Sequence, residues 1–486
     1  MIDLTTHDEG IRAGARRCGE RNIEIPTFAQ MKDPGLVPAS VVGELGSIGL
    51  WDVHPRNLFR ITWKNEPVAH GGGFGPVNAM ELPPELTGVP ARILALVGKW
   101  FPTGAHKVGA TFGCIVPRLV TGRFDPSREK AVWPSTGNYC RGGAYVAALL
   151  GCESIAILPR EMSSERFEWL KTVAGEVIAT PGGESNVKEI FDACDELRAS
   201  RDDIVIFNQF EELGNHLWHY EVTGSAMDEA LRSAIRSGER FAGVVLSSGS
   251  AGTLGCGDYM KERYPGSRIA VAEALQCPTL LENGYGAHRI EGIGDKHVPW
   301  IHNVRNTDLV IAVDDELTVR LMRLFNEAEG RDYLVGRGVP AALVATLDRV
   351  GVSGICNVVA AVKTARYLEL DDRDIVATVF TDSMELYASR LAELSRERGA
   401  YTRDDAIRDY EALMRVGTDS MLELRLPDRR RIHNLKYYTW VEQQGRDLDE
   451  LNRQWRDRHE YWNREGVADR LDRAIEAFNA LAGGPP

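Results

Sequence analysis

The chain has 486 residues and a formal net charge of −13, with 43% apolar and 26% charged residues. This length exceeds one simple core, and the balance is that of a globular protein with two or more domains. The acidic charge argues against a nucleic-acid binder, and no apolar run reaches the roughly 20 residues that cross a bilayer, which argues against a membrane protein.

The cysteines and the amino terminus bear on the cellular compartment. The eight cysteines include no C-x-x-C pair, so we expect neither a zinc site nor a disulfide framework. His216 and His219 could present two ligands but have no clear third, and we expect no metal. Residues 1–9 lack the basic and apolar regions of a signal peptide. We therefore expect a cytoplasmic protein.

Residues 1–90 are rich in turn residues and poor in periodicity, which indicates an N-terminal extension packed on a core. From 91 to 395, short apolar strands alternate with glycine-rich turns and helices. This pattern predicts an α/β fold of two doubly wound subdomains, with mostly parallel sheets and helices on both faces. We expect strands at 91–97, 131–133, 154–158, 176–179, 204–207, 244–246, 269–273 and 376–383, and helices at 108–116, 144–150, 163–174, 185–200 and 258–263.

Within this core, residues of about 130–225 would form a smaller, mobile subdomain. Residues 396–486 are charged and helical in pattern, with a long helix near 466–481. We expect them to form a C-terminal helical extension. Ligands of open α/β sheets bind at the carboxyl ends of the strands, so the loops there are the candidates for chemistry.

Lys107 follows the first apolar strand and the turn Pro102-Thr-Gly104, and it opens an apolar helix. A lysine in this position is expected to be partly desolvated, which lowers an amine's pKa and makes it a better nucleophile and base. The alternative is a lysine that extends from a surface helix into water.

The loop Ser135-Thr-Gly-Asn138 joins a buried strand to an apolar helix. Its backbone N–H groups and small polar side chains could bind an anion such as a carboxylate. The alternative is a helix cap with ordinary turn chemistry.

A second loop, Gly249 to Gly255, follows another buried strand and precedes a helix. Its small residues and the hydroxyls of Ser250 and Thr253 could bind a phosphate. The loop also resembles a loose dinucleotide fingerprint with Glu273 on the next strand, although the glycine spacing is not G-x-G-x-x-G. A nicotinamide-dependent dehydrogenase is therefore an alternative.

A third candidate is the polar end of the strand 376–383. Asp382 or Ser383 could meet a ring nitrogen, and a plain strand-end cap is the alternative.

Together these stretches resemble pyridoxal-phosphate enzymes of the tryptophan-synthase-β fold (fold type II), and most of all the cysteine synthase and cystathionine β-synthase branch. The resemblance spans about residues 91–390, in one consistent order. It is carried by Pro102–Lys107, Ser135–Asn138, Gln209-Phe210, Gly249–Thr253, His288–Gly294 with Val298-Pro299, Gly351–Gly354 and Thr381–Ser383.

The resemblance implies pyridoxal 5′-phosphate as the cofactor and Lys107 as the catalytic lysine that holds it as a Schiff base. The implied cofactor-binding residues are Lys107, Asn138, Gly249, Ser250, Ala251, Gly252, Thr253 and Ser383. The implied substrate-binding residues are Ser135, Thr136, Gly137, Asn138 and Gln209.

The resemblance also implies the reaction, a cysteine synthase-like β-replacement on a serine- or cysteine-type amino acid through an external aldimine and an aminoacrylate. The protein would be a homodimer that binds a small amino-acid substrate and neither nucleic acid nor membrane. A β-eliminating deaminase or desulfhydrase is an alternative with the same cofactor, and a non-catalytic binding protein is a further one.

The chain departs from the family pattern at Phe101, Tyr139, Arg141 and Ala251. If Tyr139 and Arg141 point inward, they add bulk and positive charge beside the carboxylate loop. We therefore expect a β-substituent larger or more anionic than acetyl.

Overall fold

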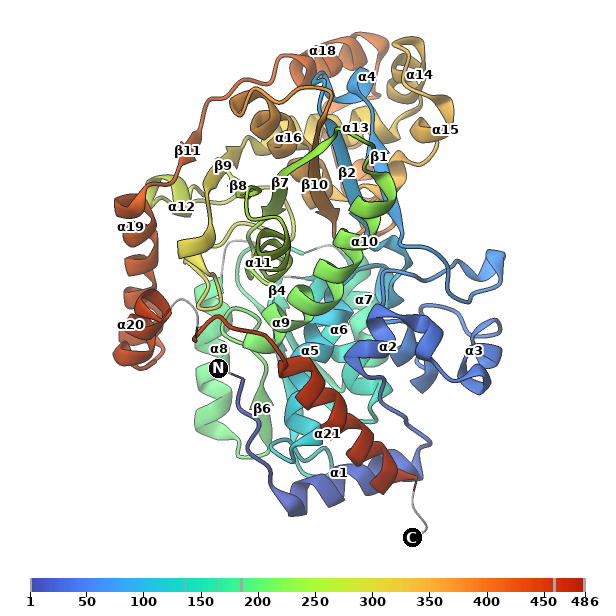
Figure 1. Ribbon diagram of the computed structural model, residues 1–486, viewed down its shortest axis with the longest axis vertical. Coiled ribbons are helices and arrows are strands. Elements are labelled where there is room, and N and C mark those ends of the chain that lie inside the picture. The colour runs from blue at the N-terminus through green and yellow to red at the C-terminus, as the bar shows by residue number, and fades with distance from the viewer. Residues whose placement is uncertain (1, 136, 163, 184–186, 458–459, 484–486) are drawn as a thin grey trace.

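Two parallel sheets organise the chain (Figure 1). The computed structural model describes residues 2–135, 137–162, 164–183, 187–457 and 460–483. One sheet has seven strands and the other has four. The larger sheet lies in the upper half of Figure 1 and the smaller sheet in the lower half.

The larger sheet combines strands from all parts of the chain. Its inner strands are parallel, and an antiparallel strand closes each edge. The strands in order across the sheet are β1 (Ala79–Leu82), β2 (Arg92–Val97), β10 (Asp374–Phe380), β7 (Arg240–Ser247), β8 (Arg268–Ala274), β9 (Leu309–Val313) and β11 (Met421–Glu423). The inner strands are almost wholly buried, as the near-continuous apolar runs predict.

The smaller sheet is parallel throughout. Its strands in order are β5 (Glu176–Thr180), β4 (Ser154–Pro159), β3 (Lys130–Pro134) and β6 (Ile204–Ile206). On one face of the smaller sheet, α6 (Asn138–Leu149) packs against β3 and β4, and α5 (Lys107–Val120) packs on α6. On the opposite face lies α8 (Val187–Ser200). Each of the two sheets is thus covered by helices.

The helices that cover the sheets differ from face to face. On the larger sheet, α16 lies on one face with α13 behind it, while α10 and α11 lie on the other. The helices within the core are α4 (Pro84–Thr87), α5 (Lys107–Val120), α6 (Asn138–Leu149), α7 (Ser164–Val173), α8 (Val187–Ser200), α9 (Leu213–Trp218), α10 (Gly224–Ala234), α11 (Leu254–Arg263), α12 (Thr279–Glu282), α13 (Asp315–Asn326), α14 (Ala328–Gly336), α15 (Ala341–Val344), α16 (Val352–Tyr367) and α17 (Ala388–Arg398).

The first and last helices pack together at the bottom of Figure 1, where α21 (Val467–Ala482) contacts α1 (Asp8–Glu20). Asp472 of α21 accepts hydrogen bonds from the backbone of Phe28 and Ala29, so it caps α2. The terminal helices are α1 (Asp8–Glu20), α2 (Phe28–Lys32), α3 (Ala39–Leu45), α18 (Arg403–Met414), α19 (Leu426–Lys436), α20 (Leu448–Arg456) and α21 (Val467–Ala482).

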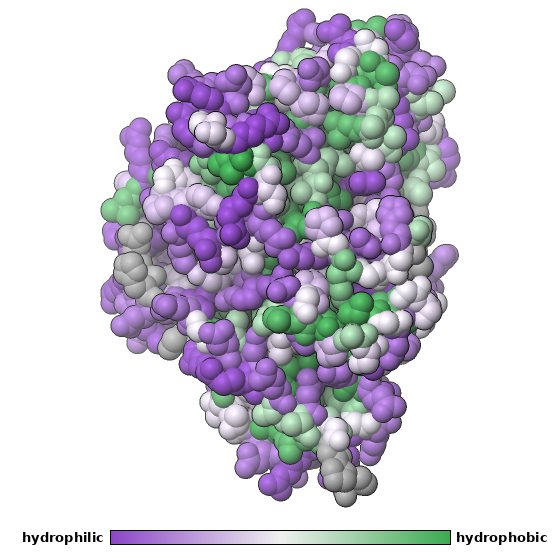
Figure 2. All heavy atoms as spheres, turned by 45° about the vertical axis from the view of Figure 1, so that its right-hand side comes forward, coloured by the Kyte–Doolittle hydropathy of each residue, from purple (hydrophilic) through white to green (hydrophobic). Residues whose placement is uncertain are grey.

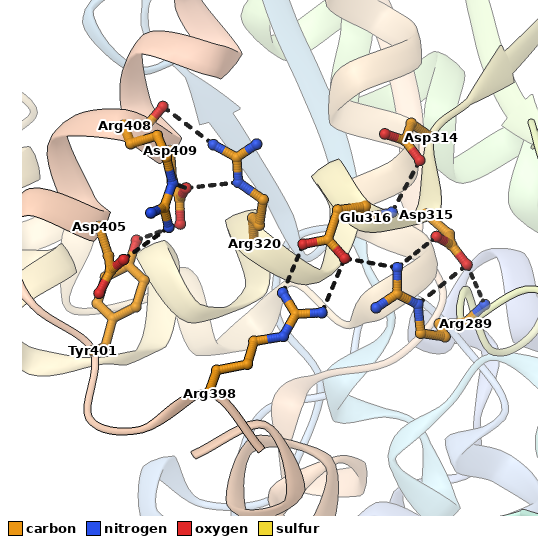
Figure 3. Close-up of polar contacts among 10 residues, drawn as sticks. All are labelled: Arg289, Asp314, Asp315, Glu316, Arg320, Arg398, Tyr401, Asp405, Arg408 and Asp409. Atoms are coloured by element: carbon orange, nitrogen blue, oxygen red, sulfur yellow. Dashed lines mark hydrogen bonds and ion pairs between the residues drawn. The ribbon is translucent and has the colours of Figure 1, made fainter. Parts of the chain in front are cut away.

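Ion pairs attach the C-terminal region to the core (Figure 3). Arg320 of α13 donates to Asp409 of α18 at 2.7 Å. Glu316 at the start of α13 pairs with Arg398 at the end of α17 at 2.6 Å and with Arg289 at 2.8 Å. Arg289 belongs to a loop that leads to the cavities described below, so these pairs reach from the surface toward the interior.

The predicted fold class is confirmed, and every predicted strand has a counterpart. The predicted domain boundaries at residues 90 and 395 stay a prediction, although β1 and β11, from the two flanking regions, both pair with the larger sheet. In the part of the chain that the structure describes, no helix is long and apolar enough to cross a membrane.

Candidate active site

Lys107 lies where the two sheets come together. It is the first residue of α5, which follows the carboxyl end of β2. Thr103 and Gly104 have positive φ angles of 64° and 69°, so the chain turns sharply before the helix. The half-buried Lys107 Nζ lies 3.2 Å from Ser250 Oγ and 3.3 Å from Gln209 Oε1. The lysine therefore bridges the glycine loop after β7 and the segment after β6.

Two small cavities of about 20 Å³ each meet at Lys107. The glycine-loop cavity is lined by His106, Lys107, Leu246, Ser247, Gly249, Ser250, Ala251, Gly252, Thr253, Gly292, Asn357, Val379 and Thr381. The Asn138 cavity is lined by Lys107, Ser135, Gly137, Asn138, Tyr139, Gln209, Phe210, Gly249, Ser250, Gly292, Ile293, Asp295 and Thr381. A space of this size holds about one water molecule.

The loop of the glycine-loop cavity consists of small residues because other segments of the same chain lie close to it. A Cβ at Gly252 would overlap the side chain of Asn215, and a Cβ at Gly249 would lie 2.9 Å from Gly292 O. Ala251 has a φ of +63°, and the loop leads into the N-terminus of α11. Backbone N–H groups and the positive end of the helix dipole favour an anion such as phosphate here.

Ser250 is the side chain that links this loop to its neighbours. Its Oγ accepts hydrogen bonds from Lys107 Nζ, from Asn215 Nδ2 at 3.0 Å and from Gly252 N at 3.4 Å. Asn215 Nδ2 also donates to Gln209 O at 3.0 Å. The glycine loop and the segment around Gln209 are thus held in one network.

The Asn138 cavity takes its polar groups from the smaller sheet. Ser135, at the carboxyl end of β3, accepts hydrogen bonds from Gln209 Nε2 at 2.9 Å and from Gly137 N at 3.4 Å. Asn138 is the first residue of α6, and Thr136 lies outside the described residues. The predicted substrate residues Ser135, Gly137, Asn138 and Gln209 therefore line one space beside Lys107.

Asp382 and Ser383 follow β10 and are fully buried. Asp382 Oδ2 accepts hydrogen bonds from Asn138 Nδ2 at 2.5 Å and from Tyr387 OH at 2.7 Å. Burial raises the pKa of the Asp382 carboxyl, against the lowering effect of these two hydrogen bonds. Ser383 Oγ is buried and has no hydrogen-bond partner in the described chain. Neither side chain lines the cavities, whereas their neighbour Thr381 lines both.

Arg141 does not lie where the sequence led us to expect it. Its guanidinium lies against the rings of Trp51 and Trp169, at 5.2 and 5.0 Å from their centroids. It is absent from the residues that line the Asn138 cavity, whereas Tyr139 is among them. The condition on which we expected positive charge beside the substrate, that Arg141 points into the pocket, is therefore not met, whereas Tyr139 does add bulk to its lining.

The sequence analysis missed two residues of the cavity walls, Asn357 and Asp295. Asn357, in α16, lines the glycine-loop cavity and donates from Nδ2 to Val379 O at 2.8 Å. Asp295 lines the Asn138 cavity, and burial raises the pKa of its carboxyl to about 7 although the nearby Lys107 charge opposes this. A carboxylate directly after Gly292-Ile-Gly294 was the available signal for Asp295, while Asn357 lies inside a helix with no sequence signal.

Comparisons with known proteins agree with this geometry. The family model described as "Pyridoxal-phosphate dependent enzyme" matches residues 99–345. Cystathionine beta-synthase of Saccharomyces cerevisiae is 25% identical over 329 residues, which cover 66% of this chain and 62%, less than two thirds, of the yeast protein. A probable cysteine synthase of Bacillus subtilis is 30% identical over 277 residues, 56% of this chain and 86% of that one.

Solved structures show the same fold. The O-acetylserine dependent cystathionine beta-synthase of Helicobacter pylori superposes with a TM-score of 0.54 at 24% identity, over 64% of this chain and 95% of the other. The cysteine synthase of Entamoeba histolytica gives a TM-score of 0.55 at 22% identity, over 69% of this chain and 92% of the other. The family model covers half of the chain, and the fold is that of these solved structures, so the chain belongs to the pyridoxal-phosphate dependent enzymes.

Proposed function

We propose that this enzyme catalyses β-replacement on a serine- or cysteine-type amino acid, with Lys107 as the lysine that binds pyridoxal 5′-phosphate. The observation that carries the proposal is the position of Lys107 Nζ, within 3.3 Å of both Ser250 and Gln209. One amine therefore reaches a cradle for an anion on one side and neutral hydrogen-bonding groups on the other. The relatives named cysteine synthase and cystathionine beta-synthase support the substrate class.

The residues present fit the cofactor. A phosphate group suits the small residues from Gly249 to Thr253 at the start of α11. Two buried polar atoms without partners in the described chain, Asn138 Oδ1 and Ser383 Oγ, suit a ring hydroxyl and a ring nitrogen. We assign the ring nitrogen to Ser383, as the resemblance implies, because its buried hydroxyl has no partner in the described chain. The adjacent Asp382 is the alternative, since its Oδ2 accepts from Asn138 and Tyr387 but its buried Oδ1 has no partner there.

When bound, pyridoxal phosphate withdraws electrons from the amino acid joined to it and so weakens the bonds at Cα. Lys107 Nζ would hold the cofactor and, once the substrate amine has replaced it, would take the proton from Cα as general base. Ser250 Oγ and Gln209 Oε1 orient this amine through their hydrogen bonds. A neutral Ser383 hydroxyl would leave the ring nitrogen unprotonated, which favours chemistry at Cβ over transamination.

The substrate α-carboxylate would bind in the Asn138 cavity. Ser135, Gly137, Asn138 and Gln209 line this cavity, and Thr136 of the same loop stays a predicted contact. Gln209 Nε2 is held by Ser135 Oγ at 2.9 Å, so the two side chains act as one unit.

We further propose a homodimer in the cytoplasm. All eight cysteines are free and buried, which suits a reducing compartment. Figure 2 shows apolar surface between hydrophilic areas on the face that carries α2, α3 and α10, and such surface is often covered by a partner. Sedimentation of the purified protein gives its mass in solution, and a monomer there would contradict the dimer.

Reduction with borohydride followed by peptide mapping tests the function. We expect a yellow protein whose cofactor becomes fixed to Lys107, and a visible spectrum that shifts when serine- or cysteine-type amino acids are added. Lys107→Ala should lose the label, while Lys99→Ala should keep it because Lys99 pairs with Asp348 at 2.8 Å. A label on another lysine, or no spectral response to any of these amino acids, would contradict the proposal.

A further inference from the structure

Asp295 is a buried carboxyl group at the wall of the Asn138 cavity. Its side chain lines this cavity together with Lys107, Ser135 and Gln209, and the residue is 8% exposed. Its Oδ2 is buried and has no hydrogen-bond partner in the described part of the chain. A buried carboxyl group without a partner costs free energy, so its presence in a reaction cavity points to a chemical use.

Two other buried carboxylates, Asp258 and Asp409, are satisfied by their neighbours, whereas Asp382 keeps a buried Oδ1 without a partner in the described chain but lines neither cavity. Asp258 accepts from Asn303 at 3.0 Å and Asn306 at 2.6 Å. Asp409 accepts from Arg320 at 2.7 Å and Tyr401 at 2.9 Å. Asp295 differs because Lys107 is the other charged residue that lines its cavity in the described chain. The nearby His297 is neutral because burial lowers its pKa to about 3.

The backbone around Asp295 fixes where the carboxyl group lies. Asp295 O accepts a hydrogen bond from Thr279 Oγ1 at 2.7 Å, and Gly294 N donates to Ser248 O at 2.9 Å. Gly292 and Gly294 have positive φ angles of 96° and 77°, which other residues rarely adopt. The loop is therefore anchored to the strand end that precedes the glycine loop, and Asp295 is held rather than free to turn into solvent.

We propose that Asp295 is a general acid–base at Cβ, which protonates the leaving group and then deprotonates the incoming nucleophile. This inference rests on the proposed function and adds a second proton-transfer group to Lys107. Two residues of one cavity would then transfer protons, Lys107 at Cα and Asp295 at the β-substituent. The pKa of about 7 suits both directions of transfer at neutral pH.

The protons and electron pairs balance over one turnover. Lys107 takes the proton from Cα, the bond from Cβ to X breaks, X leaves with the bonding pair, and Asp295 supplies the proton that makes it H–X. The nucleophile H–Nu then gives an electron pair to Cβ and its proton to the Asp295 carboxylate. Lys107 returns a proton to Cα, so the net change is the exchange of X for Nu, and no oxidation or reduction occurs.

The proposal specifies the class of substrate. A hydroxyl group leaves only with a proton, whereas acetate leaves without one, so an acid beside Cβ is needed for serine and not for O-acetylserine. An anionic substituent such as phosphate would meet a carboxylate of like charge. We therefore infer that the enzyme acts on an amino acid with a free hydroxyl or thiol at Cβ.

The test measures the elimination half-reaction alone, as the change in the visible spectrum after serine or O-acetylserine is mixed with wild type or Asp295→Asn and before any nucleophile is added. We expect the rate of this step to fall by about 100-fold or more with serine and by less than about tenfold with O-acetylserine. Asp332→Asn is the matched control, since it removes an exposed carboxylate on α14. Equal losses with both substrates, or an unchanged rate with serine, would overturn the proposal. No turnover of either substrate by wild type would instead contradict the proposed function.

A second readout does not depend on turnover. The raised pKa means that native Asp295 keeps a proton that the unfolded chain loses near pH 4, so wild type loses stability as pH rises from about 4 to 7. The Tm of the Asp295→Asn holoenzyme minus that of wild type should therefore increase from pH 5 to 7.5 and be constant at higher pH. A difference that is constant with pH would overturn the proposal.

Chemical rescue keeps the proposal testable if the Asn variant binds cofactor poorly. Asp295→Ala removes the carboxyl group, and added formate should restore part of the rate with serine and leave the rate with O-acetylserine unchanged. Rescue of both substrates to the same degree would mean that the carboxyl group is structural.

Discussion

The two cavities beside Lys107 are built in different ways. The glycine-loop cavity takes the largest share of its lining from one continuous loop of small residues, Gly249–Thr253, after a strand of the larger sheet. The Asn138 cavity takes its lining from several separate segments, among them those of Asn138, Gln209 and Asp295. A larger side chain in the loop would occupy the first cavity, while the second cavity depends on polar side chains that the fold brings together from separate segments.

The difference between the two cavities indicates which property of the enzyme a substitution in each cavity would change. In the proposed function, the backbone cradle would bind the phosphate of the cofactor, and its residues are kept small by the space available. The groups of the Asn138 cavity would meet the amino-acid substrate, and Gln209 among them is held by Ser135. Changes on the first side should therefore affect cofactor binding, and changes on the second should affect turnover.

The largest expected effect is on the glycine loop, with Gly252→Asp. A Cβ at this position overlaps Asn215, which in turn holds Ser250, and the new carboxylate would repel a phosphate. We expect cofactor affinity to fall by at least about 100-fold, which is about 3 kcal/mol. The measurement is the ratio of bound cofactor to protein by absorbance after dialysis.

Gly266→Asp is the matched control for this change. Gly266 is exposed, and a Cβ there meets nothing within 4 Å. Its cofactor content should equal that of wild type. Full cofactor content in Gly252→Asp would place the phosphate elsewhere.

An intermediate effect is expected on the other side, with Asn138→Ala. This change removes the donor to Asp382 at 2.5 Å and one wall of the Asn138 cavity. We expect borohydride labelling of Lys107 to persist while turnover falls by about 100-fold, as for loss of one preorganised donor.

Asn357→Ala provides the opposite case. Asn357 lines the glycine-loop cavity and not the Asn138 cavity, so its loss should weaken cofactor retention more than it slows the loaded enzyme. If both variants showed the same balance of effects, the division of labour between the cavities would be wrong.

The glycine-loop cavity was largely predictable from sequence because its parts are contiguous. A strand, a run of small residues and a helix in succession already specify an anion cradle. Lys107 was predictable for the same reason, since the turn before it and the apolar helix after it are local features. The parallel sheets followed from buried apolar runs such as those of β4 and β9.

The rest depends on which distant segments meet, and sequence patterns do not carry that information. Asp295 is informative because its carboxyl group is buried without a partner, which only the packed structure shows. Arg141 illustrates the reverse, since two tryptophans from distant segments hold a guanidinium that the sequence placed near the substrate. Asn357 lies within α16, next to the apolar run from Val358 to Val362.

The smallest expected effect tests whether the Asn138 cavity depends on ion pairs at the protein surface. Glu316 holds Arg398 and Arg289 in the ion-pair network of Figure 3, and these partners lower the pKa of its carboxyl to about 2. Its side chain is 39% exposed, so solvent screens the pairs and Glu316→Gln should cost only about 0.5–1 kcal/mol. Glu411→Gln, which removes a single exposed pair with Arg415, should cost less.

The pH dependence gives the sign of this last prediction. A carboxyl group whose folded pKa lies below its unfolded value stabilises the protein above about pH 4.5, and that contribution is lost as pH falls toward 2. The difference in Tm between wild type and Glu316→Gln should therefore be constant from pH 7 to about 5 and shrink as the pH falls below about 4.5. KM should not change, because Arg289 keeps its pair with Asp315 at 2.8 Å. A raised KM would mean that the geometry of the Asn138 cavity depends on the ion pairs of Glu316 at the surface.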